Sequence, residues 1–222
     1  IWQAGSDVNE ERGRLDITHF DSLTSKQLKK IEKVENKAVK DKIVVEKEIL
    51  SKALAEKRFG FTLYQGGFVP GGEVRVVHVK GFDAQACGGT HLDNTKEIGQ
   101  IKLLGSKRIQ DGVIRISYVS GDIAKQLEEE ERRLGSEILS AFGSRSGTVT
   151  LEQIADASKI LKSQKEHLPK TISRFIKEMR EMSKKLNKPV PKIKVQPIPE
   201  AVEELFSTWK RLRKELRKFK RK

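Results

Sequence analysis

The hydrophobic pattern of the chain changes at Gly121. Before this residue, short alternating runs bounded by glycines and turn residues are typical of strands, with brief helical stretches between them. After it, apolar residues recur at three- and four-residue steps almost to the end, as they do in amphipathic helices. The pattern predicts an α+β fold: a domain over residues 1–121 with a mainly antiparallel sheet and flanking helices, followed by an α-helical extension.

Two local signals are specific within the first part. A helix is predicted over residues 23–41, where apolar residues keep helical spacing behind a cap at Thr24 or Ser25. A β-hairpin is predicted over residues 98–121, because Asp111-Gly112 separates two alternating runs. These elements define the larger part of the predicted sheet.

The second part divides at its prolines. Residues 122–187 predict a helical extension interrupted at Pro169. Residues 188–199 hold four of the six prolines and predict an extended linker. Residues 200–222 predict a basic amphipathic helix. We expect this last helix to form a separate arm that does not pack continuously on the preceding helix.

The net charge of +14 is unevenly placed. Residues 1–121 hold 20 basic against 16 acidic residues, whereas residues 122–222 hold 25 against 15. A polyanionic partner explains this excess, and so does a solvated, lysine-rich helix surface. The sequence contains no run of 18 apolar residues, so it does not indicate a membrane-spanning helix, and it shows no signal-peptide pattern that would indicate secretion. A single cysteine fits a reducing, cytoplasmic setting.

The loop "QACGGTHLDN", residues 85–94, carries that cysteine, Cys87, and His91. Cys and His are zinc ligands, and the C-x3-H spacing lets one loop supply two of them. A zinc site requires at least one further ligand, and among the other histidines His19, at a strand end, is the best placed. The pair alone does not establish a metal site. The glycine-rich stretch 60–73 lacks a phosphate-binding motif and predicts a turn or lid loop.

Several motifs in order along residues 1–121 resemble one family. They are "WQAGSDV", "RLDITHF", "LYQGGFVPGGEVRVV" and "ACGGTH" followed by "IGQIKLLGSKRIQDGVIRISYVSG". This region is similar to the second part of the editing domain of alanyl-tRNA synthetases, in its archaeal form. The helical continuation is similar to the segment that leads towards the C-terminal domain of those enzymes. Because the chain begins without Met, we expect it to be a segment of a longer protein.

The resemblance implies a zinc-dependent hydrolase of mischarged Ser-tRNA(Ala) or Gly-tRNA(Ala). Cys87 and His91 match two zinc ligands of the family, and the other two are expected in a His-x3-His pair before Ile1. Gln3 corresponds to the residue that contacts the mischarged amino acid, and Thr18 offers a hydroxyl for discrimination. The residues expected to border the terminal adenosine are Gly66, Gly67, Gly71 and Gly72.

The resemblance also implies partners. The parent enzyme attaches alanine to tRNA(Ala) with ATP in a separate domain, and a C-terminal domain makes it a homodimer. The residues expected to contact tRNA phosphates are Lys210, Arg211, Arg213, Lys214 and Arg217. Two alternatives stay open: a non-catalytic tRNA-binding or spacer module, and a free-standing editing protein of the same superfamily.

Overall fold

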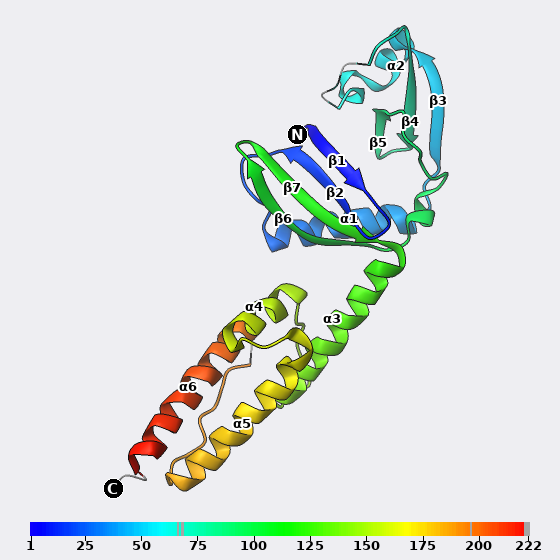
Figure 1. The fold of residues 1–222 in the computed structure, drawn as a ribbon. Helices are drawn as coiled ribbons and strands as arrows, with labels where there is room; N and C mark the ends of the chain where they lie inside the picture. Colours follow the sequence, from blue (N-terminus) through cyan, green and yellow to red (C-terminus); the bar gives the residue numbers. More distant parts are fainter. Residues whose placement is uncertain (66, 68, 196, 220–222) are drawn as a thin grey trace. The chain divides into compact units, whose positions relative to one another are not determined.

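The structure is a computed structural model that describes residues 1–65, 67, 69–195 and 197–219. The chain forms two compact units, Ile1–Gln126 and Leu127–Lys222 (Figure 1). The first contains two antiparallel sheets with helices, and the second is helical, which confirms the predicted α+β class. No helix in the described ranges is both long and apolar enough to cross a membrane.

A four-stranded antiparallel sheet in the first unit has the order β1-β2-β7-β6. Its strands are β1 (Gln3–Val8), β2 (Gly13–Thr18), β6 (Ile101–Gln110) and β7 (Val113–Ser120). The predicted hairpin is confirmed as β6 and β7. Gly112 in its turn has φ 72°, a conformation that glycine adopts without the steric penalty of a side chain.

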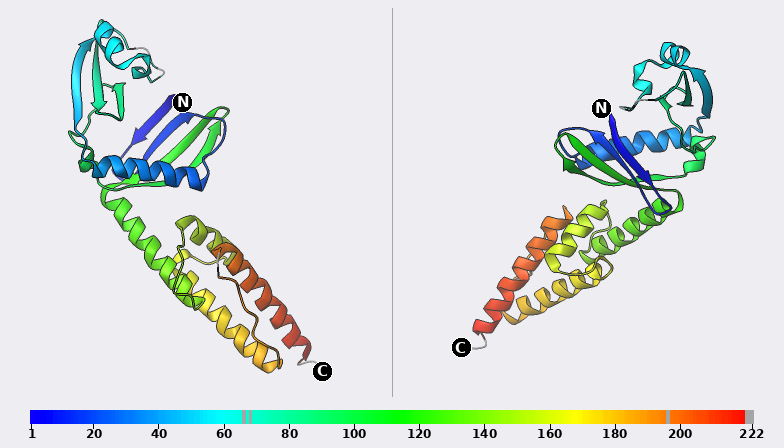
Figure 2. Two further views of the ribbon diagram at one scale, coloured as in Figure 1. Left: turned by 180° about the vertical axis from the view of Figure 1, so that it is seen from behind. Right: turned by 45° about the horizontal axis from the view of Figure 1, so that its top comes forward.

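Helix α1 (Ser25–Lys40) lies across one face of this sheet (Figure 2). Thr24 is its cap: the Thr24 hydroxyl accepts from the backbone of Gln27, and the Gln27 side chain accepts from the backbone of Thr24. The Asn36 side chain exchanges two hydrogen bonds with the backbone of Ile101 in β6, at 2.7 and 2.9 Å. The predicted helix is therefore confirmed, and a polar contact fixes its position on the sheet.

A three-stranded antiparallel sheet in the same unit has the order β3-β4-β5. Its elements are β3 (Val45–Ser51), α2 (Lys52–Phe59), the 3-10 turn η1 (Phe61–Leu63), β4 (Glu73–Val79) and β5 (Asp83–Ala86). One face buries a small apolar core made of Ala55, Leu63, Val74 and Val76. Because alternate residues of a strand face opposite sides, Lys47 in β3 and Arg75 in β4 point to the other face.

The second unit packs four helices around one core. They are the end of α3 (Gly121–Ala141), α4 (Leu151–Leu161), α5 (Leu168–Lys185), which follows the 3-10 turn η3 (Lys165–His167), and α6 (Ile198–Phe219). The chain leaves helical geometry at Lys162, which has φ 50°, and Pro169 lies in the first turn of α5. The break between helices that was predicted at Pro169 therefore lies before this residue, at Lys162. Pro169 itself belongs to the next helix, because proline is tolerated in the first turn of a helix.

The expectation that the last helix forms a separate arm is wrong. Helix α6 packs against both α4 and α5 (Figure 1). Its Ile198, Val202 and Leu205 are fully buried in the common core, and Val195 of the preceding segment packs on that core too. Prolines specify an extended connection, but they do not prevent it from returning along the helices. The apolar stripe of α6 requires burial, and the core supplies it.

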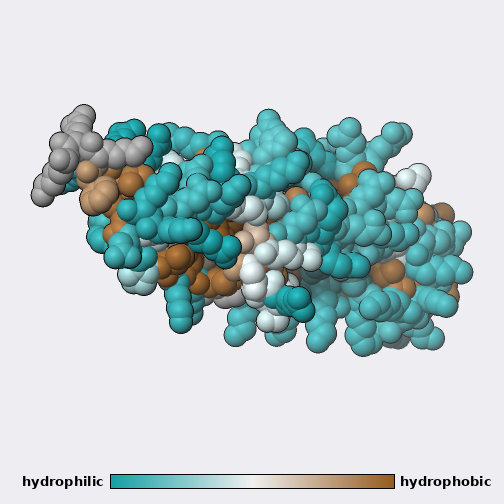
Figure 3. All heavy atoms as spheres, turned by 90° about the horizontal axis from the view of Figure 1, so that it is seen from below, coloured by the Kyte–Doolittle hydropathy of each residue, from teal (hydrophilic) through white to brown (hydrophobic). Residues whose placement is uncertain are grey.

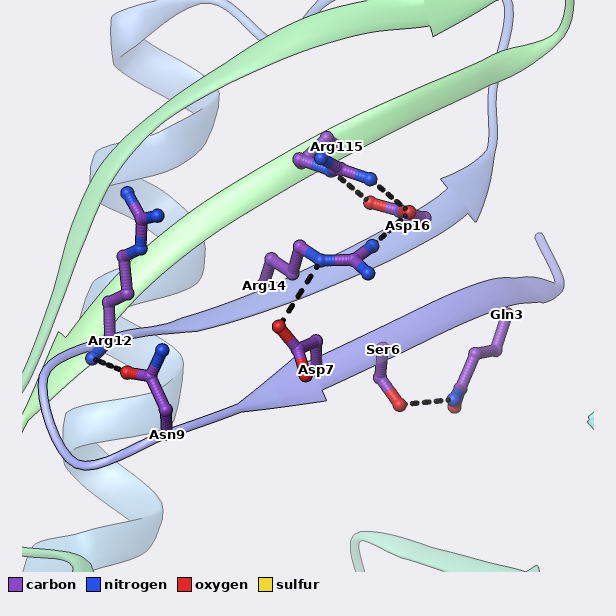
Figure 4. Close-up of polar contacts among 8 residues, drawn as sticks. All are labelled: Gln3, Ser6, Asp7, Asn9, Arg12, Arg14, Asp16 and Arg115. Atoms are coloured by element: carbon purple, nitrogen blue, oxygen red, sulfur yellow. Dashed lines mark hydrogen bonds and ion pairs between the residues drawn. The ribbon is translucent and has the colours of Figure 1, made fainter.

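A buried carboxylate connects β2 to β7 and, through an arginine, to β1 (Figure 4). Asp16 in β2 is only 6% exposed, and it accepts two hydrogen bonds from Arg115 in β7, at 2.8 and 2.9 Å. Arg14 donates a third, at 2.8 Å, and lies 3.6 Å from Asp7 in β1. The hydrogen bonds and charge of Arg115, with those of Arg14, hold the pKa of Asp16 below its ordinary value against the opposing effect of burial.

We predict that Asp16→Asn lowers the free energy of unfolding by about 2 kcal/mol at neutral pH, because it removes charge-assisted hydrogen bonds from a buried group. The contribution of the ionised Asp16 is present above its unfolded pKa, near 3.8, and is lost as pH falls through the lower folded pKa. Urea unfolding across this pH range should show that the difference in free energy of unfolding between variant and wild type becomes smaller below about pH 4. The exposed Asp7 provides the control, since Asp7→Asn should change stability by less than about 1 kcal/mol.

A second prediction tests the packing of α6. Leu205→Ala should destabilise the helical unit by about 2 to 5 kcal/mol, because it leaves a cavity in a closed core. Phe219→Ala, at a side chain 63% exposed, should change stability by less than about 0.5 kcal/mol. Urea unfolding followed by helical circular dichroism compares the two. Equal stability of both variants would contradict the packed position of α6.

Candidate functional site

The loop of residues 87–94 follows β5 and leads to the 3-10 turn η2 (Thr95–Ile98). Its first residue donates from the Cys87 backbone to the Arg75 carbonyl at 3.1 Å. Near its end, the Val45 backbone donates to the Asp93 carbonyl at 2.9 Å. Backbone hydrogen bonds to neighbouring strands therefore fix both ends of the loop.

Two cations hold the middle of the loop by its carbonyl oxygens. Arg75 Nη1 donates to the carbonyls of Cys87 and Gly89, at 2.6 and 2.9 Å. Lys47 Nζ donates to the carbonyl of His91 at 2.8 Å and pairs with the Asp93 carboxylate at 2.5 Å. The hydrogen bond and charge of Lys47 lower the pKa of Asp93. Arg75 and Lys47, on one face of adjacent strands, thus determine the course of the loop.

The loop brings the Cys87 thiol and the His91 ring to the same small space. A Cβ atom added to Gly89 would lie 3.6 Å from Cys87 Sγ and 3.7 Å from His91 Cε1, whereas a Cβ at Gly88 would meet nothing within 4 Å. Neither glycine has a positive φ. A methyl group at position 89 would therefore lie in ordinary van der Waals contact with both the thiol and the imidazole.

One hydrogen bond sets the chemistry of His91. Its Nδ1 lies 3.0 Å from the Gly89 carbonyl oxygen, which can only accept, so Nδ1 carries the proton. In the neutral ring this leaves the lone pair of Nε2 free to bind a metal. A carbonyl that orients a histidine in this way is the usual outer partner of a metal ligand. The half-buried Cys87 and the exposed His91 therefore fit two positions of a zinc site.

Within the described ranges, no group of three or more His, Cys, Asp and Glu residues is placed to hold a metal ion. His19 lies in the turn after β2, where its Nδ1 is 2.7 Å from the Asp21 carbonyl oxygen. His78 in β4 lies 3.5 Å from the Glu46 carboxylate and contacts the Phe59 ring. The structure thus joins Cys87 and His91 to each other, without His19 or His78.

Gln3 and Thr18 lie on adjacent strands of the four-stranded sheet. The Gln3 side chain donates to the Ser6 hydroxyl at 3.1 Å (Figure 4). The Thr18 hydroxyl accepts from the Trp2 backbone at 2.7 Å, so its own proton stays available for another acceptor. Within the described part of the chain, no hydrogen bond joins these side chains to the loop of residues 87–94. Their role in a substrate pocket stays a prediction.

Of the glycines predicted to border a substrate, Gly66 lies outside the described residues. Gly67, Gly71 and Gly72 have nothing within 4 Å of an added Cβ, and Gly71 has φ 88°. The Gly72 carbonyl accepts from the Lys52 backbone at 3.0 Å, which ties the end of this stretch to the start of α2. These glycines face open space, and their proposed contact with adenosine stays a prediction.

The basic residues predicted to contact tRNA divide between two sides of α6. Lys210, Arg213, Lys214 and Arg217 line one surface hollow. Arg211 instead lies close enough to Glu215 to lower the pKa of that carboxyl, an effect in which a hydrogen bond from Lys188 is the largest part. The sequence reasoning treated these cations as equivalent and missed this division.

Arg75 and Lys47, which shape the loop, were also missed. Only a weak signal marks Arg75 in the sequence, as a cation between valines of a mainly apolar strand. Lys47 lies between Glu46 and Glu48 and carries no such signal. Their target lies at least 12 residues away along the chain, so the pairing depends on strand register.

The chain is similar in sequence to segments of known proteins. Residues 74–117 match the family model described as "Threonyl and Alanyl tRNA synthetase second additional domain". The chain is 42% identical over 185 residues to the alanine–tRNA ligase of Methanococcus maripaludis (strain C7), covering 83% of this chain and 18% of the relative. It is 38% identical over 208 residues to that of Pyrococcus furiosus, covering 92% and 21%. It spans about a fifth of the length of these curated relatives.

We predict that Arg75→Lys raises the reaction rate of the Cys87 thiol with a disulfide reagent by roughly tenfold, because the lysine side chain ends one bond short of the Nη1 atom that donates to both carbonyls. The chain has one cysteine, so the reagent reports on this loop alone. Arg58→Lys is the matched control, since Arg58 in α2 donates to both oxygens of Glu48 in β3, at 2.8 Å, away from this loop. Equal rates in both variants would contradict the role given to Arg75.

Proposed function

We propose that this chain, which is homologous to a segment of archaeal alanine–tRNA ligases, forms part of a zinc-dependent site that hydrolyses mischarged tRNA(Ala). The observation that carries the proposal is the shared space of Cys87 and His91 on a loop held by Arg75 and Lys47. The remaining zinc ligands are expected in a His-x3-His pair that precedes residue 1 in the longer, cytoplasmic protein.

The need for such a site follows from the size of the substrates. A pocket built for alanine cannot firmly reject glycine, which is smaller, or serine, which adds one hydroxyl. Binding alone discriminates only weakly between alanine and these two amino acids, and a second site that hydrolyses the wrong ester supplies the remaining discrimination. The substrates expected here are therefore Ser-tRNA(Ala) and Gly-tRNA(Ala). The attachment of alanine with ATP belongs to another part of the ligase.

The residues of this chain would divide the work. When bound, zinc supplies Lewis acidity at the ester. Cys87 as a thiolate and His91 through Nε2 hold and position the ion, and the Gly89 carbonyl keeps the imidazole in the required tautomer. Gln3 contacts the mischarged amino acid, and the Thr18 hydroxyl donates a hydrogen bond to it. The open glycine stretch around residues 67–72 lets the terminal adenosine approach the backbone.

A second candidate function is a non-catalytic tRNA-binding module. The basic hollow on α6 favours this function, because its cations could bind tRNA without the loop of residues 87–94, which belongs to the other unit. The two functions are compatible in one protein. Loss of hydrolysis together with retained tRNA binding separates them.

We predict that Cys87→Ala in the full-length protein slows hydrolysis of Ser-tRNA(Ala) by at least about 100-fold, because losing a metal ligand exceeds the effect of losing its outer partners. Alanine attachment by the same variant should stay unchanged. Release of labelled serine and charging with labelled alanine measure the two activities. Normal hydrolysis by Cys87→Ala would overturn the proposed metal site.

A paired substitution tests the shape of the site without removing a ligand. Gly89→Ala adds a methyl group in contact with both the thiol and the imidazole, where a bound zinc ion would need room, and should lower both zinc content and hydrolysis. Gly88→Ala adds the same methyl group to open space and should change neither. Metal analysis of the purified full-length variants, alongside the hydrolysis assay, gives two independent results. Equal zinc content in both variants would contradict this geometry.

A further inference from the structure

A surface hollow of about 610 Å³ lies along the C-terminal half of α6. Five cationic side chains and one indole line it among the described residues, with no acidic side chain: Trp209, Lys210, Arg213, Lys214, Arg217 and Lys218. Figure 3 shows a face of the molecule covered mainly by hydrophilic residues, with hydrophobic ones exposed between them. The hollow therefore offers concentrated positive charge beside an aromatic ring.

Four of these cations form one stripe along the helix. Lys210, Arg213, Lys214 and Arg217 follow the i, i+3, i+4, i+7 spacing of one helical face, and all four are exposed. Successive turns place positive charges about 5.4 Å apart along the axis. Such a row matches an extended chain of negative charges better than it matches a single small anion.

Aromatic rings hold part of the stripe in place. Lys210 Nζ lies 4.0 Å from the centre of the Phe206 ring, and the Arg213 guanidinium lies 4.9 Å from that of Trp209. The Trp209 ring is fixed in turn, since its Nε1 donates to Glu178 at 2.6 Å. The rings limit the rotation of the two cations while leaving the charges at the surface. Less conformational entropy is then lost when an anion binds.

The apolar side of α6 is packed in the core of the helical unit along most of the helix. Leu205 is fully buried and Leu212 is only 4% exposed, both in the core of the helical unit. A helix that binds a lipid surface inserts an apolar face into it, and α6 has already used that face. This arrangement favours a polyanion that is read by charge alone.

We propose that the stripe of Lys210, Arg213, Lys214 and Arg217 binds the phosphodiester backbone of RNA without sequence preference, and that Arg211 takes no part. The choice of RNA as the polyanion rests on the proposed function, in which the whole protein handles tRNA. Backbone binding of this kind fixes the position of an RNA and contributes affinity, while other parts of the protein determine specificity.

The test is the salt dependence of binding of uncharged tRNA by the full-length protein. In Lys214→Gln/Arg217→Gln, the slope of log affinity against log salt concentration should decrease by about 2, one for each phosphate that the variant no longer neutralises. The control is Arg180→Gln/Arg211→Gln, which removes two exposed cations that do not line the hollow. The control should keep the wild-type slope.

Three outcomes would overturn the inference: an unchanged slope in the test variant, an equal decrease in the control, or loss of binding to vesicles of anionic lipid with tRNA binding intact. Uncharged tRNA carries no ester, so this experiment does not depend on hydrolysis. If the slope decreases in Lys214→Gln/Arg217→Gln but Cys87→Ala still hydrolyses Ser-tRNA(Ala), the proposed editing site is wrong and the RNA-binding stripe is supported. If the slope is unchanged but Cys87→Ala is inactive, the stripe is wrong and the editing site is supported.

Discussion

The guanidinium of Arg75 determines the geometry on which the candidate site depends. Its donors hold the carbonyls of Cys87 and Gly89, so a loop rich in glycine takes one course instead of many. Glycine loses more conformational entropy on ordering than any other residue, and charge-assisted hydrogen bonds offset that loss. The thiol and the imidazole then meet across Gly89. A loop with the same two side chains but without this cation would hold them less closely.

Each unit uses the same physical device for a different purpose. In the first, cations bind inward to backbone carbonyls and shape a loop. In the second, cations of α6 lie over aromatic rings and face outward into a hollow whose described lining has no acidic side chain. A positive side chain can therefore serve as a structural clamp or as a binding surface. Its hydrogen-bond partner distinguishes the two more clearly than its place in the sequence.

The features that sequence reasoning predicted are local ones. Thr24 and Gln27 begin a helix through contacts three residues apart, and Asp111-Gly112 turns a hairpin within one short segment. The pairing of Arg75 with the loop and the return of α6 to its core depend on distant segments. The prolines of residues 188–199 suggested separation because they report local conformation only. Burial of an apolar stripe is a tertiary event, which local conformation cannot predict.

The contacts of the loop reach far back along the chain. Lys47 and Lys42 bind residues that follow them by 44 and 52 positions. Contacts between segments so far apart close long stretches of chain, and closing them costs more chain entropy than forming local contacts does. In a zinc finger the metal supplies much of the free energy of folding, whereas here the strands and two cations also contribute to the order of the loop.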